Sequence, residues 1–457
     1  MLIGLRHDSR PAWLLPVVST LFTVSLLWKL FSQRPPLFGV TAPPANTNPT
    51  CKAYHKEILF NCEDLRLFPN DSPWALLSCD KGRRSWSPTF SNYALGAPEG
   101  ELFLWNWRDA PEVEPVLIPF KGAIGENGTT SGDFHPVGVS VVPLDASRHR
   151  LFVTNQAHQT AFVEVLDFDL KTSSYQHIQT IRNRRIHSPN GIVALDANHF
   201  FVTSDMYFSR TWAAGVIVEA GLGLPLAEVL YVALTKDKDG VQGARVQLVA
   251  KLAVPSGIEI DRDSKTIWVS SLVSGVYEYG YNIQPKREAK DDKYNDPLFP
   301  LQFMPRAFIR TPFWPDNIML SQDKKLYVSG AYSAEGFFTS MLSKDAKKPH
   351  SWTLELLPKL TKQELATEEG RRELGLRMAD PANNKLRKEE MRWRSAFWDD
   401  GSMYGLVSTG GVVNLGRGRG EGFIGVGVLE EGVLHCQRKG QGRGWLLKAK
   451  EDVHQEL

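Results

Sequence analysis

A short motif recurs four times in this chain, and each copy opens a strand, a polar turn and a second strand. The copies are residues 136–139 (PVGV), 189–192 (PNGI), 255–258 (PSGI) and 315–318 (PDNI), which lie 53, 66 and 60 residues apart. A repeating unit of this length that contains only strands and turns is typical of radial β architectures. The sequence therefore predicts an all-β fold, a β-propeller.

The size of the chain sets the number of blades. Its 457 residues are 42% hydrophobic and 23% charged, which is typical of a globular protein. The propeller is expected over 51–437, interrupted by a charged surface insertion at 361–394 in which Thr361 and Glu364 predict a helix capping box. Without the insertion, about 350 residues remain, and at about 60 residues per repeat they make six blades.

The N-terminal region differs from the body. Residues 12–28 are an uncharged run of 17 residues, at the short end for a bilayer span. No clear cleavage site follows, so 1–35 is expected to be an uncleaved signal anchor, with a cleaved signal peptide as the alternative. A Pro-rich stalk is expected at 36–50 and a basic polar tail at 438–457.

These features predict a protein of the secretory pathway. The propeller would be membrane-anchored and lie in the lumen or outside the cell, or it would be secreted if the signal is cleaved. A net charge of +2 gives no reason to expect nucleic acid as a partner. Two short sequons make the chain a candidate glycoprotein, at Asn70 and Asn127.

The four cysteines allow three pairings. Cys62 and Cys79 are equidistant from the turn predicted at 69–72, so they would face each other across an antiparallel hairpin. Cys51 and Cys436 remain, at the two ends of the strand-rich body, where a disulfide would clamp a ring. Four buried thiols are the alternative.

One apolar segment, 211–234, carries Glu219 and Glu228 and is therefore not expected to span a membrane. We expect either a lid or membrane-facing helix beside the opening of the ring, or a long buried hairpin.

The variable positions of the repeat carry polar oxygens, on Asn190, Ser256, Asp316 and Asn317. In a propeller the innermost strands line a central channel, so residues at their starts meet at one mouth. The adjacent acids Glu63 and Asp64 start the first hairpin and are candidates to join them. Such oxygens suit a hard cation such as calcium, whereas the simpler explanation is that Asn and Asp form turns before strands.

Several stretches of the chain, taken in order, resemble the serum paraoxonase/arylesterase family. They are Cys51, CEDLRLFPN (62–70), FHPVGVS (134–140), SPNGIVAL (188–195), TSDMYF (203–208), PSGIEI (255–260), PDNIML (315–320) and VLHC (433–436). The resemblance covers most of the body. It implies a six-bladed propeller closed by a disulfide between its ends, a retained N-terminal hydrophobic segment, and two calcium ions in the tunnel, one catalytic and one structural.

The resemblance also implies which residues hold these ions. The positions that match ligands of the catalytic ion are Glu63, Asn190, Ser256, Asp316 and Asn317. Ser256 stands where the family has an Asn. For the structural ion, Asp64 and the carbonyl of Val139 match, whereas Gly191 replaces an Asp ligand, so one calcium ion is expected more firmly than two.

The chain departs from the family at the histidine pair that helps to generate hydroxide. Val137 and Gln156 stand at those two positions, and Met206 replaces a histidine common near the metal. His135 and His158 each lie two residues away on the same strand face, which makes them candidate substitutes.

The function expected from these features is calcium-dependent hydrolysis of a small hydrophobic ester or lactone, of the arylesterase/lactonase type. The metal would polarise the carbonyl, and Asp316 would take the proton from the attacking water or, alternatively, act as the nucleophile. The alternative is a non-catalytic, calcium-stabilised propeller that acts as a membrane-anchored binding protein. A different propeller enzyme, for example of the strictosidine-synthase-like group, is a third interpretation.

Overall fold

The computed structural model describes residues 50–87, 92–93, 96–120, 133–157, 160–209, 212–236, 242–283, 300–343, 347–379, 392–416 and 418–437. The expected anchor (1–35), most of the stalk (36–50), the tail (438–457), Asn127 and His158 lie outside these residues. Among the described helices, none is both long enough and apolar enough to cross a bilayer.

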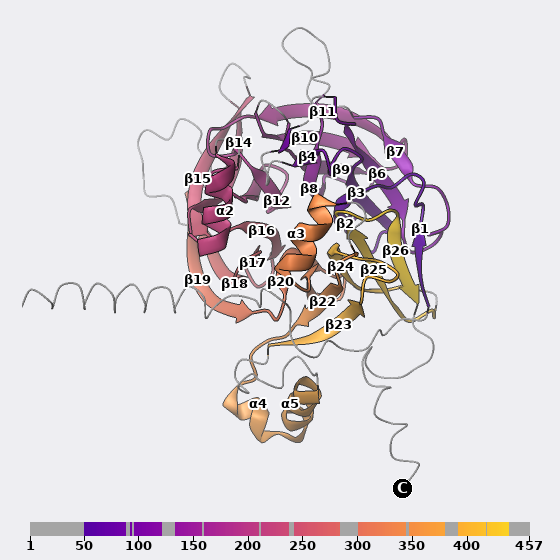
Figure 1. Ribbon diagram of the computed structural model, residues 1–457, viewed down its shortest axis with the longest axis vertical. Helices are drawn as coiled ribbons and strands as arrows, with labels where there is room; N and C mark the ends of the chain where they lie inside the picture. The colour runs from indigo at the N-terminus through magenta and orange to yellow at the C-terminus, as the bar shows by residue number, and fades with distance from the viewer. Residues whose placement is uncertain are drawn as a thin grey trace, which may run out of the picture. The chain divides into compact units, whose positions relative to one another are not determined.

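Six four-stranded antiparallel sheets follow one another along the chain and surround a common axis (Figure 1). From the innermost strand outward, blade 1 is β2 (Cys62–Leu67), β3 (Trp74–Asp80), β6 (Gly100–Asn106) and β7 (Val116–Ile118), and blade 2 is β8 (Pro136–Pro143), β9 (Arg148–Asn155), β10 (Phe162–Asp169) and β11 (Ser174–Ile181). Blade 3 is β12 (Pro189–Ala194), β13 (His199–Ser204), β14 (Ala227–Lys236) and β15 (Gln242–Leu252), and blade 4 is β16 (Pro255–Asp261), β17 (Thr266–Ser271), β18 (Gly275–Ile283) and β19 (Leu301–Arg310). Blade 5 is β20 (Trp314–Leu320), β21 (Leu326–Ala331), β22 (Ser351–Leu356) and β23 (Trp393–Asp399), and blade 6 is β24 (Val407–Asn414), β25 (Glu421–Gly427), β26 (Val433–Gln437) and β1 (Cys51–Tyr54).

The predicted six-bladed propeller is confirmed. Each innermost strand contacts the next, from β2 through β8, β12, β16, β20 and β24 back to β2. Apolar side chains fill the space between neighbouring blades. Leu76 and Leu104 of blade 1, for example, share a core with Val139, Leu151 and Leu166 of blade 2. Burial of this apolar surface between blades is what holds the sheets in a ring.

The ring is closed by a strand from the far end of the sequence. β1 is the outermost strand of blade 6, and its Cys51 pairs with Cys436 of β26 in register and through a disulfide. Cys62 and Cys79 face each other across β2 and β3 and form the second disulfide. Both predicted pairings are confirmed. Two disulfides are typical of proteins that fold in the secretory pathway or act outside the cell.

A bulge interrupts every innermost strand near its start. The register against the second strand shifts at Cys62/Asp64, Pro136/Val139, Pro189/Ile192, Pro255/Ile258, Pro315/Ile318 and Val407/Thr409. The recurring motif is therefore the sequence of a bulge, and a bulge redirects side chains where a strand must turn them to a site.

The glycine of the motif is needed for close packing around the axis. A Cβ atom built on Gly138 would clash with the carbonyl oxygen of Asn190, and one on Gly191 would clash with that of Ser256. An aspartate side chain at 191, expected from the family pattern, therefore has no room in this backbone.

In the part of the chain that the structure describes, four helices and one short ribbon lie between the strands. Their bounds are α2 (Ala213–Leu222), α3 (Ala334–Leu342), α4 (Lys362–Ala366), α5 (Glu368–Ala379) and the ribbon of β4 (Trp86–Ser87) with β5 (Asn92–Tyr93). The described part of 211–234 is not a long buried hairpin, because it consists of helix α2 and then the start of strand β14. The capping box of Thr361 and Glu364 is confirmed at α4. The charged insertion expected at 361–394 ends two residues earlier in the structure. Strand β23 begins at Trp393, and its side chains pack into the blade.

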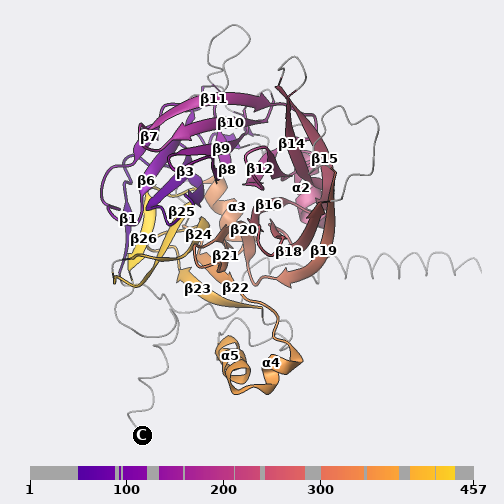
Figure 2. The ribbon, with the colours of Figure 1, turned by 180° about the vertical axis from the view of Figure 1, so that it is seen from behind.

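Helices α2 and α3 lie on one face of the ring. They stand in front of the blades in Figure 1 and behind them in Figure 2. α2 follows β13, whose last residue Ser204 pairs with Pro189 at the start of β12. α3 follows β21, which ends at Ala331 opposite Trp314 at the start of β20. Both helices therefore belong to the mouth at which the innermost strands begin.

Candidate functional site

The site is built from the bulges of the six innermost strands. The bulge positions are Glu63, Val137, Asn190, Ser256, Asp316 and Ser408, in blade order. Four of the sequence-predicted ligands are among these six, and Asn317 follows Asp316 directly. Ser408 was missed because β24 lacks the Pro-x-Gly pattern of blades 2 to 4.

Ser256 connects three blades. Its Oγ donates to Oδ1 of Asp316 at 2.7 Å and lies 3.4 Å from Oδ1 of Asn190. The amide of Asn190 also contacts Asp205, because its Nδ2 lies 3.4 Å from Oδ2 of that residue. The oxygens of blades 3, 4 and 5 therefore meet at one place on the axis.

Glu63 is held through its backbone, which leaves its carboxylate for the site. Its carbonyl oxygen accepts hydrogen bonds from Asn317 Nδ2 at 3.1 Å, from Ser408 Oγ at 2.7 Å and from Thr409 Oγ1 at 3.0 Å. Blades 5 and 6 thus clamp the first blade at this point. The Asn317 side chain is therefore directed toward the backbone of Glu63.

A series of hydroxyl groups on the second strands fixes the bulge residues of the following blades. Thr154 Oγ1 donates to the carbonyl of Asn190 at 2.8 Å, and Thr203 Oγ1 donates to that of Ser256 at 2.6 Å. Ser270 and Ser78 donate in the same way to the carbonyls of the next blades, at Asp316 and Val137. The sequence carries a signal for three of these hydroxyl groups. A Thr or Ser follows an aromatic residue and a valine at 152–154 (FVT), 201–203 (FVT) and 268–270 (WVS).

The carboxylates of the site are buried and repel one another. Glu63 is 6% exposed, and burial together with the charge of Asp316 raises its pKa to about 8. Burial also raises the pKa of Asp316, to about 6, and the pKa of Asp205. The guanidinium of Arg83 counteracts this, but its Nη2 is 4.0 Å from Oε2 of Glu63. If all three groups were ionised, their negative charge would exceed what this one guanidinium can neutralise, so a bound cation would favour their ionised forms.

The donor set decides which cation could bind. Among the described residues, no group of three or more His, Cys, Asp or Glu side chains is arranged to hold a metal ion. The site instead combines two carboxylates with amide and hydroxyl oxygens. This all-oxygen chemistry is preferred by calcium rather than by zinc or other metals that take nitrogen and sulfur ligands.

His135, the candidate substitute base, contacts Asp80 and is separated from the candidate calcium ligands by Arg83. Its Nδ1 is 3.1 Å from Oδ2 of Asp80, and it is 3% exposed. Arg83 stands between the two groups, because its Nε is 3.9 Å from the same Asp80 oxygen. The positions of the family histidines are occupied by the buried Val137 and by Gln156, whose Nε2 donates to the carbonyl of Pro189 at 3.0 Å. Met206 is buried as well.

The residues expected at the second ion are engaged by a side chain of the protein. Nε of Arg66 donates at 3.1 Å both to Oδ2 of Asp64 and to the carbonyl of Val139. Sequence reasoning did not single out Arg66, although it lies in the stretch CEDLRL.

Part of the chain is similar in sequence to one family of known proteins. The family model described as "Arylesterase" matches residues 97–286. The chain is 27% identical over 219 residues to chicken (Gallus gallus) serum paraoxonase/arylesterase 2, a match that covers 48% of this chain and 55% of that protein. It is 27% identical over 227 residues to human (Homo sapiens) serum paraoxonase/arylesterase 1, covering 50% of this chain and 57% of that protein. Over about half of its length the chain is therefore similar to the paraoxonase/arylesterase family.

The extent of the family match is limited. The chain spans about half the length of the curated family members it matches, 55% and 57% for the two above. The family model includes Asn190 and Ser256 but ends before Asp316. Among solved structures, the periplasmic gluconolactonase of Pseudomonas aeruginosa aligns over 84% of this chain and 85% of that one, with 11% identity and a TM-score of 0.37.

Proposed function

We propose that this chain belongs to the paraoxonase/arylesterase family and is a calcium-dependent hydrolase of small hydrophobic esters or lactones. The observation that carries the proposal is the hydrogen-bonded contact of Ser256 with Asp316, beside Asn190 and next to the buried carboxylate of Glu63. Buried carboxylates that lack a neutralising partner destabilise a fold unless a cation joins them.

The residues that would hold calcium are Glu63, Asn190, Ser256, Asp316 and Asn317. They fit the ion in number and in chemistry, because calcium accepts six to eight oxygens from carboxylates, amides, carbonyls and water. When bound, calcium supplies a Lewis acid for the carbonyl of the substrate. Ser256 fixes one oxygen of Asp316, and the amide of Asn190 is fixed by Asp205.

Asp316 is the proposed base. Its Oδ1 accepts from Ser256, whereas no described residue donates a hydrogen bond to its Oδ2. That oxygen can therefore take a proton from a water molecule at the mouth of the tunnel. His135 is the proposed substitute if Asp316 serves only as a ligand, because Asp80 already orients its ring. His158 remains a third candidate from the sequence.

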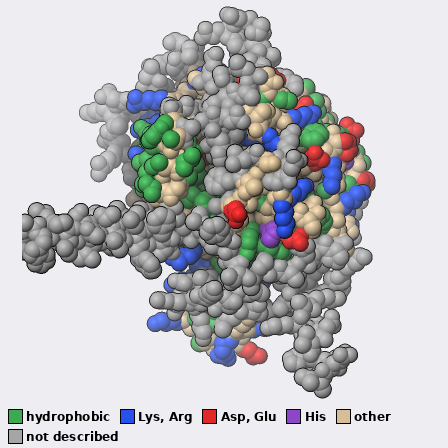
Figure 3. All heavy atoms as spheres, in the orientation of Figure 1, with side chains coloured by type: hydrophobic (Ala, Val, Ile, Leu, Met, Phe, Trp, Pro, Cys, Tyr) green, Lys and Arg blue, Asp and Glu red, His purple; other side chains and the backbone are tan. Residues whose placement is uncertain are grey.

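An apolar surface lies beside this mouth. The exposed residues include Trp212 (52%), Ile217 (73%) and Tyr207 (52%), on α2 and the segment before it. In Figure 3 hydrophobic side chains gather where Figure 1 draws α2. We propose that hydrophobic substrates reach the site across this surface.

The proposed setting is the lumen of the secretory pathway or the outside of the cell, with residues 12–28 as a membrane anchor. The two disulfides and the uncharged run of 17 residues support it. Alkaline carbonate extraction of membranes tests the anchor. A full-length chain that stays in the pellet supports it, and a chain released into the supernatant contradicts it.

One observation favours a binding protein as the second candidate. Val137 is 1% exposed and apolar, and the amide of Gln156 is committed to a backbone carbonyl, so neither can replace the family histidines. A calcium-stabilised propeller without catalysis would keep the cation ligands and lose only these groups.

The deciding experiment measures hydrolysis of phenyl acetate and of an aliphatic δ-lactone by the full chain, with calcium and after chelation. Asp316→Asn is expected to lower the rate constant by at least ~100-fold. Asp263→Asn, in an exposed turn, is the matched control and is expected to keep full activity. Turnover that survives both chelation and Asp316→Asn contradicts the proposed mechanism. No turnover at all, with a melting temperature that still depends on calcium, favours the binding protein.

A further inference from the structure

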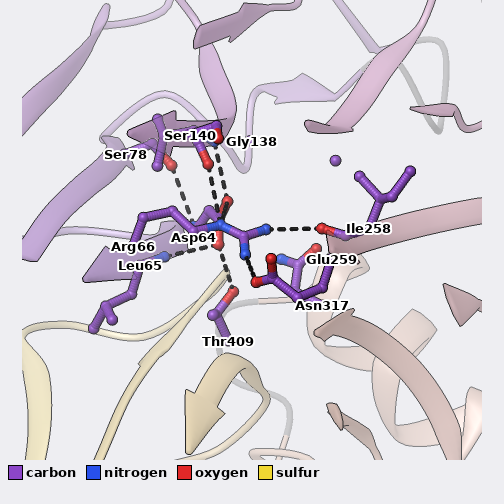
Figure 4. Close-up of polar contacts among 12 residues, drawn as sticks. Asp64, Leu65, Arg66, Ser78, Gly138, Ser140, Ile258, Glu259, Asn317 and Thr409 are labelled. Carbon is purple, nitrogen blue, oxygen red and sulfur yellow. Dashed lines mark hydrogen bonds and ion pairs between the residues drawn. The ribbon is translucent and has the colours of Figure 1, made fainter. Parts of the chain in front are cut away.

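Arg66 fills the tunnel just beyond the candidate calcium site. Its side chain extends from β2 across the axis, and Figure 4 shows the guanidinium between Asp64 on one side and Ile258 and Glu259 on the other. Nη1 donates to the Glu259 carboxylate and, at 3.3 Å, to the carbonyl of Ile318. Nη2 donates to the carbonyl of Ile258 at 3.2 Å. Arg66 is 8% exposed, so these bonds form away from bulk water.

These contacts join opposite sides of the ring. Arg66 belongs to blade 1, and its partners Ile258 and Glu259 belong to blade 4, which is the facing blade in a ring of six. Its Nε reaches Val139 of blade 2 and its Nη1 reaches Ile318 of blade 5. Through Asp64, which accepts from Thr409 Oγ1 at 3.1 Å, the group also includes blade 6. One side chain therefore connects five blades.

The atoms around Arg66 form the kind of shell that a hard cation takes. They are two carboxylates, on Asp64 and Glu259, and three backbone carbonyls, of Val139, Ile258 and Ile318. The family pattern places a structural calcium ion at Asp64 and the carbonyl of Val139. That ion does not fit here, because Arg66 Nε already donates to both atoms and a side chain at Gly191 would clash with blade 4.

We propose that the guanidinium of Arg66 is the resident cation of this second site and takes the place of a metal ion. The five oxygens are fully engaged by one positive charge that belongs to the chain, so the propeller binds no metal at this depth of the tunnel. A planar guanidinium has five N–H donors, whereas an ammonium has only three for these five acceptors. The inference is independent of whether the neighbouring site is catalytic.

The test is a count of bound calcium in the full chain. Protein is stripped with chelator, re-equilibrated with calcium and passed through a desalting column, and calcium per chain is measured by elemental analysis and by calorimetric titration. Arg66→Ala removes the guanidinium and leaves its oxygens, so it is expected to bind one calcium ion more than the unaltered chain. Arg66→Lys keeps a positive charge and is expected to bind the same number as the unaltered chain.

A matched control removes an arginine that pairs with a carboxylate outside the tunnel. Arg150 donates to Asp167 at 2.7 Å and 3.0 Å, and Arg150→Ala is expected to leave the calcium count unchanged. An unaltered chain that binds two ions, or an Arg66→Ala chain that gains none, overturns the proposal. If the unaltered chain binds none and Arg66→Ala binds one, the proposal holds while the calcium-dependent function above fails.

A second measurement covers the case in which Arg66→Ala does not fold without metal. The variant is refolded with millimolar calcium and, separately, with millimolar magnesium. Recovery of the folded chain in calcium alone supports a vacated calcium-type site, because magnesium demands an octahedral shell that this irregular set does not offer. Equal recovery in both, or recovery in neither, overturns the proposal.

Discussion

Ser256 of the fourth blade and Asp316 of the fifth share a hydrogen bond of 2.7 Å between their side chains. The two residues are 60 positions apart and occupy the same place in successive copies of one motif. The bond shows that equivalent positions of the repeat bring their side chains together near the axis of the ring.

The first prediction concerns this bond. Ser256→Ala removes the hydroxyl that orients Asp316 and is itself a proposed ligand, so calcium affinity is expected to fall by about 10-fold, or about 1.4 kcal/mol. Calorimetric titration measures the change. Ser264→Ala, in an exposed turn, should leave the affinity as it is. An unchanged affinity in Ser256→Ala would remove this residue from the ligand set.

The second prediction concerns removal of calcium. Glu63 and Asp316 are buried close to one another, and a bound cation would relieve their repulsion. At a calcium concentration about 100 times the dissociation constant, binding stabilises the fold by about 2.7 kcal/mol. Chelation should therefore lower the melting temperature by several degrees in a calorimetric scan. A scan that is identical with and without chelator would show that no cation binds the folded chain.

The third prediction concerns acid. Burial, with the charge of Arg419, lowers the pKa of His435 from 6.5 to about 4, so the folded state keeps this ring neutral. Its contribution to stability is complete above pH 6.5 and is lost as the pH falls through 4, a loss on the order of 3 kcal/mol. Denaturant titrations at pH 7 and pH 4 should show a smaller loss for His435→Phe than for the unaltered chain. Equal losses would mean that His435 titrates normally.

The fourth prediction compares the two disulfides. Cys51 and Cys436 are 385 positions apart, whereas Cys62 and Cys79 are 17 apart. Loop-closure entropy gives upper limits of about 6 kcal/mol for the long loop and about 3 kcal/mol for the short one. Cys436→Ser should therefore destabilise the chain more than Cys79→Ser in denaturant unfolding. The opposite order would show that strand pairing alone, without the disulfide, holds the ring closed.

The fifth prediction contrasts two glycines. Gly191→Ala is expected to destabilise the fold by about 1–3 kcal/mol, because its methyl group would clash with the carbonyl of Ser256. In Gly221→Ala the added carbon meets no atom within 4 Å beyond its chain neighbours and the backbone of its own helix, so the change should stabilise by up to about 1 kcal/mol. Thermal unfolding of both variants checks the signs. A neutral Gly191→Ala would show that adjacent blades can move apart at the axis.

The fold was predictable because the bulge repeats in the sequence. Four copies of the motif marked four innermost strands, and the symmetry of Cys62 and Cys79 about a turn marked the fifth. The innermost strand of blade 6 could not be recognised in this way, because its sequence VSTGGVVN has neither proline nor acid at the bulge. Ser408 was therefore found only in the structure.

Some site residues can be recognised from the sequence around them, and others depend on contacts that are distant along the chain. Residues of the motif itself meet on the axis, as the repeat indicated. Arg66 was not predictable in the same way, because its partners Glu259 and Ile318 lie 193 and 252 positions away along the chain. Nothing in CEDLRL distinguishes an arginine that crosses a tunnel from one that points to solvent.

The pairing of β1 with β26, which lie at opposite ends of the propeller sequence, has a consequence for biosynthesis. β1 leaves the ribosome more than 370 residues before its partner, because β1 ends at Tyr54 and β26 begins at Val433. Until then the nascent polypeptide presents an unpaired edge at each end of an open stack of sheets, and such edges invite aggregation. Completion of the native state must therefore follow translation of β26, and a truncation a few residues into β26 should leave a product that chaperones retain rather than release.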